Sequence, residues 1–588
     1  MRTANRIWKL LPHDAAAIDR LARALNAAPI VAQLLLNRGL AEPDAARHFL
    51  TAPLSGLREP ELLPGAPAAA ERLHEAVLSK KRICVYGDYD VDGVTGTAIL
   101  YQTLRVLGAS VEFHVPHRLE DGYGLNAQAL RDLAERGVGV VITVDCGIAS
   151  PSEATEARRL GLELLITDHH EPKETLPDAA VLVHPRLPGH NYPFGYLCGS
   201  GVAFKVAWTL CKRVSGSDKV PPHLRELLLD AVALAALGTV ADVVPLKDEN
   251  RIFVRHGLAR LRQTPSLGLR ALLRSAGLDA KEKLAAADIG FSLAPRLNAV
   301  GRLGSARLAV ELLTTASEAK AAELARFLEE QNKARQMIER KISLEARALV
   351  EELNLDGSPA LVLESPGWHA GLIGIVAGRL ADTFARPVLL MASRGDGDGR
   401  IAQGSGRSVK GFRLHEALQA CGDLLLSHGG HATAAGFKLA HGNLPAFRER
   451  FCAVAAQHFA DAPPAPTLEI DAEVPLSALT TGLADALNKL DPYGSGNPQP
   501  LFLAGDLQIV GEPRRVGGGE RHLSFRVRQQ GGELRAIAFG MSDREEELMS
   551  DSGRCCLVFT PRLNEWQGRR SVDLEVRDFQ PGPRAQLG

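Results

Sequence analysis

The stretch Gly87–Gly93, GDYDVDG, follows the apolar run Ile83–Tyr86 and places an aspartate at every second position. Carboxylates held this close together raise one another's pKa, so the arrangement is costly unless a cation is shared. Hard divalent cations prefer oxygen ligands of this kind. The stretch therefore predicts a metal-binding turn at the carboxyl end of a buried strand.

Three other interpretations compete with a metal site at a strand end. A calcium-binding EF-hand loop would need a helix before it and a glutamate at its twelfth position, which is Ile99 here. A haloacid-dehalogenase-type phosphatase would use Asp90–Thr95, DVDGVT, as its nucleophile turn after a strand, and this alternative stays open. A plain acidic surface turn is the third. The rest of the chain must decide between those that remain.

The composition limits the class of protein. The chain has 588 residues, 45% of them hydrophobic. A chain of this length is too long for a single hydrophobic core and indicates about three or four domains. The formal net charge is −1, so a nucleic-acid partner would have to bind a local basic groove. The eight cysteines form no CxxC pair, which argues against a zinc site or a disulfide framework. With no signal peptide and no apolar run of membrane-spanning length, we expect a cytoplasmic protein without membrane contact.

Three further features place the acidic stretch in an α/β fold. The runs RICVYGD, VGVVITVD and LELLITDHH are apolar and β-branched, each ends at an acidic residue, and helical segments lie between them. This alternation is typical of a doubly wound parallel sheet. Ligands bind to such sheets beyond the carboxyl ends of the strands. The ends of all three runs should therefore converge on one site.

The converging strand ends carry a set of metal-binding side chains. Asp145 ends the second run, Asp168, His169 and His170 end the third, and Asp242 follows a nearly all-apolar helical segment. Carboxylates with one imidazole favour manganese or magnesium over zinc. Two such ions about 3.5–4 Å apart activate a water and stabilise the charge that builds on a phosphoryl group. The sequence predicts a site for two Mn²⁺ or Mg²⁺ ions.

The sequence outside the metal-binding domain predicts four further segments or domains. A charged helical pattern from Thr315 is longer than an ordinary packed helix, and a second α/β unit follows it. After a Pro-rich linker come short alternating segments with Gly-rich turns, which are typical of a small barrel such as an OB-fold. The expected divisions are a helical segment at 1–65, the metal-binding domain at 66–313, a connecting helix at 314–355, a second lobe at 356–460 and the barrel at 468–588.

Several stretches resemble the motifs of a known superfamily. VYGDYDVDGVTG, VDCGI, TDHH and GTVADVVPL are similar to the four motifs of the DHH phosphoesterase superfamily. The length, the later SHGGHATAAGF and the terminal barrel narrow the resemblance to the RecJ family of bacterial single-strand-specific exonucleases. The resemblance covers the chain from about Arg82 to the end. It weakens the dehalogenase interpretation, which leaves TDHH, Asp242 and the second half of the chain unexplained.

The resemblance implies roles for the acidic and histidine residues. The implied metal ligands are Asp88, Asp90, Asp92, Asp145, His169 and Asp242. Asp168 would orient His169, because metal-bound histidines usually need a partner behind them. His170 would contact the scissile phosphate or the attacking water.

Three stretches in the middle of the chain could position phosphates. APRLNAVGRLG offers Arg296, Asn298 and Arg302, although these arginines could equally pair with nearby carboxylates in a turn. GSGRS offers Ser405 and Arg407 as a compact set of donors. GGHATAAG, with Gly430 and His431, resembles the substrate-binding motif of the DHH-associated domain, where a tight turn could open a helix and present N–H groups to an anion.

The barrel should bind single strands mainly through phosphates. Basic residues occur along its segments, including Arg526, Arg528 and Arg535, whereas aromatic side chains for base stacking are sparse. The candidates for stacking are Phe525, Phe539 and Trp566.

The resemblance also implies an activity and its setting. The chain would hydrolyse single-stranded DNA from the 5′ end to mononucleotide 5′-phosphates in DNA repair and recombination. A RecQ-type helicase and a single-strand-binding protein are implied partners, and a monomer is expected. Two alternatives are a DHH-type phosphodiesterase for short oligonucleotides or cyclic dinucleotides, and a non-enzymatic DNA-binding relative. The terminal barrel favours a long polymer, and the complete set of acidic residues favours an enzyme.

Overall fold

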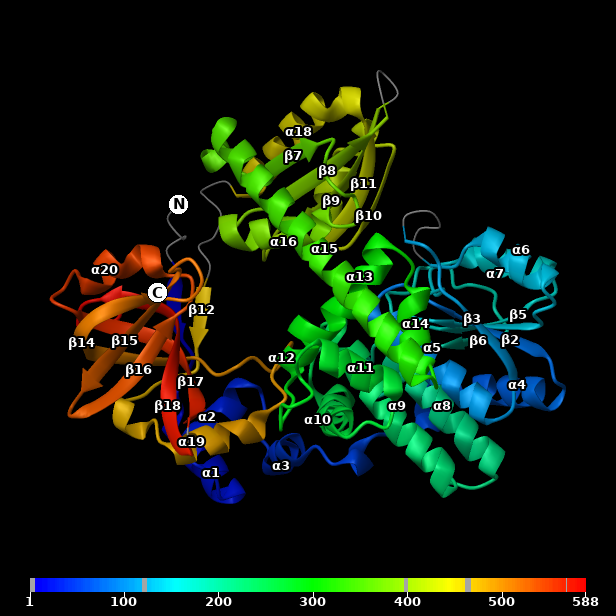
Figure 1. Ribbon diagram of the computed structural model, residues 1–588, viewed down its shortest axis with the longest axis horizontal. Helices are drawn as coiled ribbons and strands as arrows, with labels where there is room; N and C mark the ends of the chain where they lie inside the picture. Colours follow the sequence, from blue (N-terminus) through cyan, green and yellow to red (C-terminus); the bar gives the residue numbers. More distant parts are fainter. Residues whose placement is uncertain (1–5, 119–123, 396–399, 460–466, 567, 588) are drawn as a thin grey trace. The chain divides into compact units, whose positions relative to one another are not determined.

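The computed structural model describes residues 6–118, 124–395, 400–459, 467–566 and 568–587, which fall into two compact units. The larger unit comprises the described residues of 7–114, 124–294 and 467–588, and the smaller unit those of 1–6, 115–123 and 295–466. Figure 1 shows the elements of both units. In the described part of the chain, no helix is both long and apolar enough to cross a membrane.

The larger unit contains the predicted parallel sheet. Its strand order is β3-β2-β4-β5-β6, and every neighbouring pair is parallel. The strands are β2 (Arg82–Gly87), β3 (Ser110–His114), β4 (Val140–Val144), β5 (Glu163–Thr167) and β6 (Val181–Val183). The three predicted runs form β2, β4 and β5, which are the inner strands. The edge strands β3 and β6 were not predicted, because β3 is partly exposed and β6 has only three residues.

Helices cover both faces of this sheet, as expected for a doubly wound fold. On one face lie α6 (Ala127–Glu135) and α7 (Pro151–Arg159), whose apolar side chains share a core with Tyr86 and Ile166. The other face carries α4 (Ala66–Leu78), α5 (Val91–Val106) and α8 (Gly199–Ser215). Next to these pack α9 (Pro222–Ala241) and α10 (Asp248–Arg262), and the chain continues through α11 (Leu267–Ser275), α12 (Ala286–Asp288) and the π-helical turn η3 (Ile289–Leu293).

The larger unit also contains the predicted barrel. Strand β14 (Phe502–Val516) pairs with both β15 (His522–Gln529) and β17 (Arg554–Trp566), and this double pairing closes a five-stranded barrel. The remaining strands are β16 (Gly532–Ala538) and β18 (Arg569–Pro581), and two short helices, α19 (Thr481–Leu487) and α20 (Glu545–Met549), accompany them. The expectation of an OB-type barrel is confirmed.

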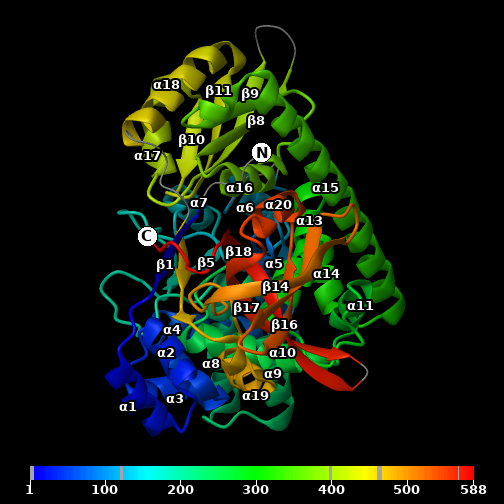
Figure 2. The same ribbon diagram turned by 90° about the vertical axis from the view of Figure 1, so that its left-hand side faces the viewer.

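The N-terminal helices pack on the barrel rather than forming a segment of their own. Helices α1 (Ala15–Leu25), α2 (Pro29–Asn37) and α3 (Pro43–Thr51) share one hydrophobic core with the barrel strands, and Figures 1 and 2 show them beside it. Strand β1 (Ile7–Leu10) pairs in parallel with β12 (Thr467–Ile470), and β13 (Ala472–Glu473) pairs in parallel with the start of β14. The sequence did not reveal the pairing of β1 with β12, because the two strands lie near opposite ends of the chain.

The smaller unit is the predicted second α/β lobe with its long helix. Its sheet has the order β10-β11-β9-β8-β7, in which only β7 and β8 are parallel. The strands are β7 (Leu361–Ser365), β8 (Val388–Arg394), β9 (Ile401–Arg407), β10 (Ser427–Gly430) and β11 (Ala434–Ala440). The helices are α13 (Ala294–Leu303), α14 (Arg307–Thr314), α15 (Glu318–Glu352), α16 (Ile373–Phe384), α17 (Leu414–Gln419) and α18 (Leu444–His458). The 35-residue α15 lies within the predicted 314–355. The Pro-rich linker is expected at 461–467, and all of it except Thr467 lies outside the described residues.

Candidate metal centre

The acidic side chains gather at the carboxyl ends of the inner strands. Asp88 and Asp90 follow β2, and Asp145 follows β4. Asp90 is the N-cap of α5, and its Oδ1 accepts hydrogen bonds from the backbone N–H of Asp92 (2.9 Å) and of Gly93 (3.1 Å). This cap places Asp92 in the first turn of α5, while Asp242 directly follows α9. Four separate elements therefore deliver carboxylates to one place.

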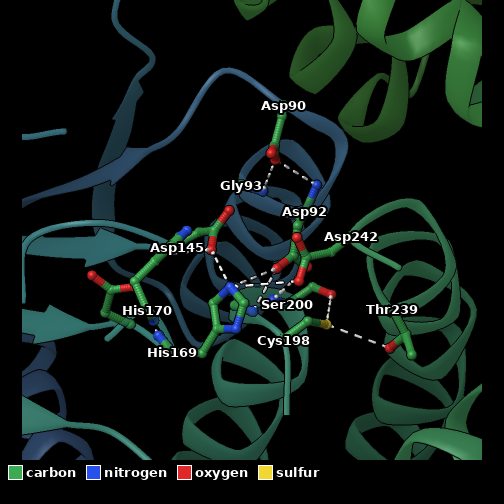
Figure 3. Close-up of polar contacts among 12 residues, drawn as sticks. Asp90, Asp92, Gly93, Asp145, His169, His170, Cys198, Ser200, Thr239 and Asp242 are labelled. Atoms are coloured by element: carbon green, nitrogen blue, oxygen red, sulfur yellow. Dashed lines mark hydrogen bonds and ion pairs between the residues drawn. The ribbon is translucent and has the colours of Figure 1, made fainter. Parts of the chain in front are cut away.

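The His169 ring lies at the centre of these carboxylates. Its Nε2 is 3.1 Å from Asp145 Oδ1, 3.6 Å from Asp242 Oδ2 and 3.8 Å from Asp92 Oδ2. Figure 3 draws these contacts as dashed lines. This nitrogen is buried and makes no hydrogen bond within the described part of the chain. Burial lowers the pKa of His169 to about 4, against the pull of the nearby carboxylates. A neutral imidazole nitrogen that faces three carboxylates is the arrangement expected of a metal ligand.

The carboxylates themselves are so crowded that a bound proton or cation must offset their charge. Burial and the charges of Asp92 and Asp90 raise the pKa of Asp145 well above its usual range. The same causes raise the pKa of Asp242 to about 8. Burial and the charge of Asp92 raise the pKa of Asp90. Such shifts mean that the anions repel one another, and bound divalent ions would remove that repulsion.

The ligand atoms form three overlapping groups. Within each group the atoms lie within 4.8 Å of one another, and the groups are Asp88, Asp90 and Asp145; Asp92, His169 and Asp242; and Asp145, His169 and His170. The first two groups have no member in common, and the third joins them through Asp145 and His169. This donor set fits two divalent ions that share ligands, with oxygen ligands in the majority, as Mn²⁺ and Mg²⁺ prefer.

Asp168 holds the ring of His170, whereas the sequence analysis assigned it to the ring of His169. The Oδ1 of Asp168 is 2.7 Å from His170 Nδ1 and accepts from the backbone N–H of both histidines. Its Oδ2 accepts from Ile148 N–H at 2.9 Å. Burial alone would lower the pKa of His170, but the hydrogen bond and charge of Asp168 outweigh it and raise that pKa to about 9. His170 is therefore a cation at neutral pH, while His169 is neutral.

Two residues behind the histidine pair were missed by sequence reasoning. The buried His184 donates from Nε2 to the carbonyl oxygen of His170 (2.8 Å), and its Nδ1 accepts from Arg186 N–H (2.9 Å). Arg186 in turn donates from Nη2 to the carbonyl oxygen of His169 (2.8 Å). The strand β6 that precedes them is too short to be recognised in the sequence, so nothing indicated that this segment reaches the site.

Asp92 is positioned by the start of α8, which sequence reasoning also missed. Its two carboxylate oxygens accept from the backbone N–H of Gly199 (2.5 Å) and of Ser200 (2.9 Å). A Cβ on Gly199 would lie 2.5 Å from the Cβ of Asp145, and a Cβ on Gly238 would lie 2.3 Å from Asp92 Oδ1. The signal that could have revealed Gly238 is that it is an isolated glycine in a helical pattern, which often marks a close approach.

The first predicted phosphate-binding stretch is a helix and not a turn. Arg296, Asn298 and Arg302 all lie on α13. Arg296 forms an ion pair with Glu329 (Nε to Oε2, 2.7 Å), and Arg302 donates to the carbonyl oxygen of Gly371 (3.2 Å). Of the two predicted alternatives, phosphate binding and pairing with a carboxylate, Arg296 therefore shows the second.

The second predicted stretch brings donors together in the smaller unit. Arg407 and Ser405 lie on β9, and Arg407 Nη1 is 3.3 Å from Ser405 Oγ. Burial and the positive charge of Arg118 lower the pKa of Arg407. Arg118 was not predicted. Two guanidinium groups that repel each other beside a hydroxyl group favour a bound anion.

The third stretch does not open a helix as expected. Gly430 ends β10 and His431 lies in the turn to β11, where His431 N–H donates to the carbonyl oxygen of Ala434 (2.8 Å). The alternating apolar residues Ala435, Phe437 and Leu439 are buried in the core and make the second half a strand. Gly430 has φ +143°, and a Cβ there would lie 2.5 Å from a backbone oxygen. This glycine therefore allows a tight hairpin.

The barrel arginines are largely paired. Arg526 and Arg528 form ion pairs with Glu533, and Arg535 lies 3.8 Å from Asp573. Phe525 is buried in the barrel core, Phe539 is exposed beside His522, and the Trp566 side chain lies outside the described residues. The positive groove expected on the barrel is therefore weaker than the arginine count suggests.

Comparison with known families identifies three parts of the chain. Residues 82–236 match the model of the DHH family N-terminal domain, residues 357–457 that of the DHHA1 domain, and residues 470–578 that of the RecJ OB domain. These matches agree with the predicted metal-binding domain, second lobe and barrel. They exclude the dehalogenase interpretation of Asp90–Thr95.

Whole-chain relatives agree with these matches. The single-stranded-DNA-specific exonuclease RecJ of Bacillus subtilis is 38% identical over 571 residues, which are 97% of this chain and 70% of that protein. A crystal structure of RecJ from Thermus thermophilus with Mn²⁺ superposes with a TM-score of 0.83 at 34% identity, covering 99% of this chain and 80% of that one. The same protein with Mg²⁺ gives a TM-score of 0.77 at 33% identity, covering 99% of this chain and 79% of that one. The chain thus belongs to the RecJ family of the DHH superfamily.

Proposed function

We propose that this chain is a metal-dependent exonuclease that hydrolyses single-stranded DNA from the 5′ end and releases mononucleotide 5′-phosphates. The observation that carries the proposal is the buried Nε2 of His169 within 3.8 Å of carboxylate oxygens of Asp145, Asp242 and Asp92. These residues with Asp88 and Asp90 would hold two Mn²⁺ or Mg²⁺ ions, the ions bound in the Thermus thermophilus relative. When bound, such ions supply an activated water and neutralise the phosphoryl charge.

The chain's own groups have distinct tasks in this proposal. His170 is fixed through Nδ1 by Asp168, so its ring can donate a hydrogen bond from Nε2 to a phosphate oxygen. Its raised pKa keeps that donor charged at neutral pH, where a charge-assisted hydrogen bond is strongest. His184 and Arg186 hold the carbonyl groups of the histidine pair and thereby fix the backbone of both side chains.

Residues of the smaller unit would bind the phosphates of the strand. We assign this role to Ser405, Arg407 and the nearby Arg118, supported by the charge repulsion between the two arginines. Asn298, Arg302, Gly430 and His431 remain candidates for the same role. Arg296 is the weakest candidate, because Glu329 already neutralises its charge.

The resemblance to the family also suggests a cellular setting. We propose a role in DNA repair and recombination in the cytoplasm, as a monomer that works with a RecQ-type helicase and a single-strand-binding protein. All eight cysteines are unpaired thiols, as a reducing compartment requires.

A comparison of linear and circular strands tests the exonuclease proposal. With Mn²⁺, a linear single strand should be degraded, whereas a covalently closed circle of the same sequence should stay intact because it has no end. Asp145→Asn should abolish degradation of the linear strand. Cleavage of the circle would show an endonuclease, and turnover of dinucleotides alone would move the chain to the short-substrate phosphodiesterases.

A further inference from the structure

Three exposed apolar side chains lie on the segments that surround the metal centre. Tyr196 is 59% exposed and lies just before the residues that hold Asp92, and Val243 is 67% exposed and directly follows Asp242. Phe291 is 85% exposed and lies on η3, which packs on the end of α9. A Cβ on its neighbour Gly290 would lie 3.7 Å from Val240 Cγ1. We call Tyr196, Val243 and Phe291 the apolar rim.

The exposure of these side chains is unusual for this chain. The exposed aromatic side chains of the described residues are Tyr196, Phe291, Phe327 and Phe539, so half of them belong to the apolar rim. Val243 has φ +60°, a conformation that is unfavourable for a β-branched residue. π-helical turns such as η3 are rare and are found often at functional sites. Exposed apolar surface and backbone strain at one place both favour a ligand-binding role.

The loop that follows Asp242 connects the metal centre to the segment before the barrel within the larger unit. Asn250 Nδ2 donates to the carbonyl oxygens of Tyr196 (2.6 Å) and Pro245 (3.1 Å), which ties the two rim segments together. One residue later, Leu246 N–H donates to the carbonyl oxygen of Ser495 (2.7 Å), in the segment that leads into the barrel. The loop after Asp242 thus carries a metal ligand at one end and the barrel contact at the other.

We propose that the apolar rim is a nucleobase-binding subsite, in which Phe291 and Tyr196 stack on bases next to the cleaved phosphate and Val243 packs beside them. This inference rests on the proposed function. The metal centre can recognise a phosphate but offers no apolar surface to a base, whereas an aromatic face binds any base without sequence preference. Bases are accessible in a single strand and hidden in a duplex, so the apolar rim contributes to single-strand selectivity.

The test combines side-chain truncation with base removal. The substrates are an oligothymidylate and a strand of equal length with two abasic nucleotides at each end, both in Mn²⁺. Phe291→Ala and Tyr196→Ala should each lower kcat/KM on the oligothymidylate by roughly five- to a hundredfold, the range of one lost stacking contact. Each should lower kcat/KM on the abasic strand less than about twofold, because that strand has no base to stack.

A matched control separates stacking from general surface effects. Leu78 is similarly exposed, at 71%, and ends α4 at the amino ends of the strands, so Leu78→Ala should change neither rate. Equal losses on both strands, or no loss on the oligothymidylate, would overturn the inference. Failure of the unchanged protein to cleave either strand would instead refute the proposed function, and the inference with it.

Discussion

At the scale of single residues, protons and divalent ions compete for the same carboxylates. The pKa of Asp242 is raised to about 8 by burial and by the charges of Asp92 and Asp90. The metal-free folded protein therefore keeps a proton that the unfolded chain loses near pH 4. Its free energy of unfolding should fall as the pH rises from about 4 to about 8.

The first prediction concerns the stabilisation by metal at two pH values. Saturating Mg²⁺ should raise the Tm more at pH 8 than at pH 6, because at pH 6 the ions must first displace protons. The affinity for Mg²⁺ should rise over the same interval, with protons released on binding. Thermal unfolding and calorimetry in two buffers measure both effects. An equal rise in Tm at both pH values would show that these carboxylates are not the ligands.

The second prediction concerns the support of the histidine pair. His184→Leu removes the donor to the carbonyl oxygen of His170, the residue after the metal ligand His169. It should lower kcat about 10- to 100-fold, the usual effect of losing support behind the ligands of a metal site. His184→Gln keeps a donor and should recover part of the rate. Metal-dependent rates and Mn²⁺ affinity are measured together. If both variants lose stability but keep kcat, His184 is only a structural residue.

At the scale of elements, the packing of α9 on α5 and α8 sets the position of Asp92. The third prediction is that Gly238→Ala weakens Mn²⁺ binding by about 10-fold or more, because its Cβ would displace Asp92 Oδ1 or Ser200 Oγ. Gly257→Ala is the matched control. Gly257 lies on α10, and its added Cβ would press on Ala236 of α9 and not on a metal ligand. Equal Mn²⁺ affinities in the two variants would contradict this role of Gly238.

The elements also show what the sequence could and could not predict. The inner strands β2, β4 and β5 were predictable because each is a continuous apolar run that ends at an acidic residue. The hairpin around Gly430 was not, because a glycine-rich turn before alternating apolar residues suits either a helix or a strand. The site's carboxylates were predictable from their place at strand ends. The partner of Asp168 and the roles of His184 and Gly238 depend on tertiary packing that no local pattern encodes.

At the scale of the whole molecule, one buried arginine joins three parts of the larger unit. Arg251 of α10 donates to the carbonyl oxygens of Phe49 (2.7 Å) and Asp491 (2.7 Å), and its guanidinium lies 3.8 Å from the centre of the Phe49 ring. It thereby links the metal-binding domain to the N-terminal helices and to the segment before the barrel. Asn497 of that segment accepts from Arg38 of the N-terminal region (2.7 Å).

The fourth prediction tests this link. Arg251→Met keeps much of the volume but leaves the buried carbonyl groups unpaired, which should lower the free energy of unfolding by about 3 kcal/mol. At temperatures below the unfolding transition, cleavage of long strands should fall more than cleavage of short oligonucleotides if the barrel binds the strand as the sequence predicts, because a short strand would not extend to the barrel. Chemical denaturation and rates on strands of several lengths measure the two effects. An equal loss of cleavage rate at all strand lengths would show that the barrel's contribution to cleavage does not depend on the link made by Arg251.

The most direct test of the account is a time course on a single-stranded DNA oligonucleotide labelled at its 3′ end, beside the same sequence as a blunt duplex. The account predicts progressive shortening of the labelled single strand with Mn²⁺, no shortening with EDTA, none on the duplex and none with Asp145→Asn. Shortening that persists with EDTA or with Asp145→Asn would contradict the metal centre. Immediate release of the labelled end nucleotide would contradict the 5′ start.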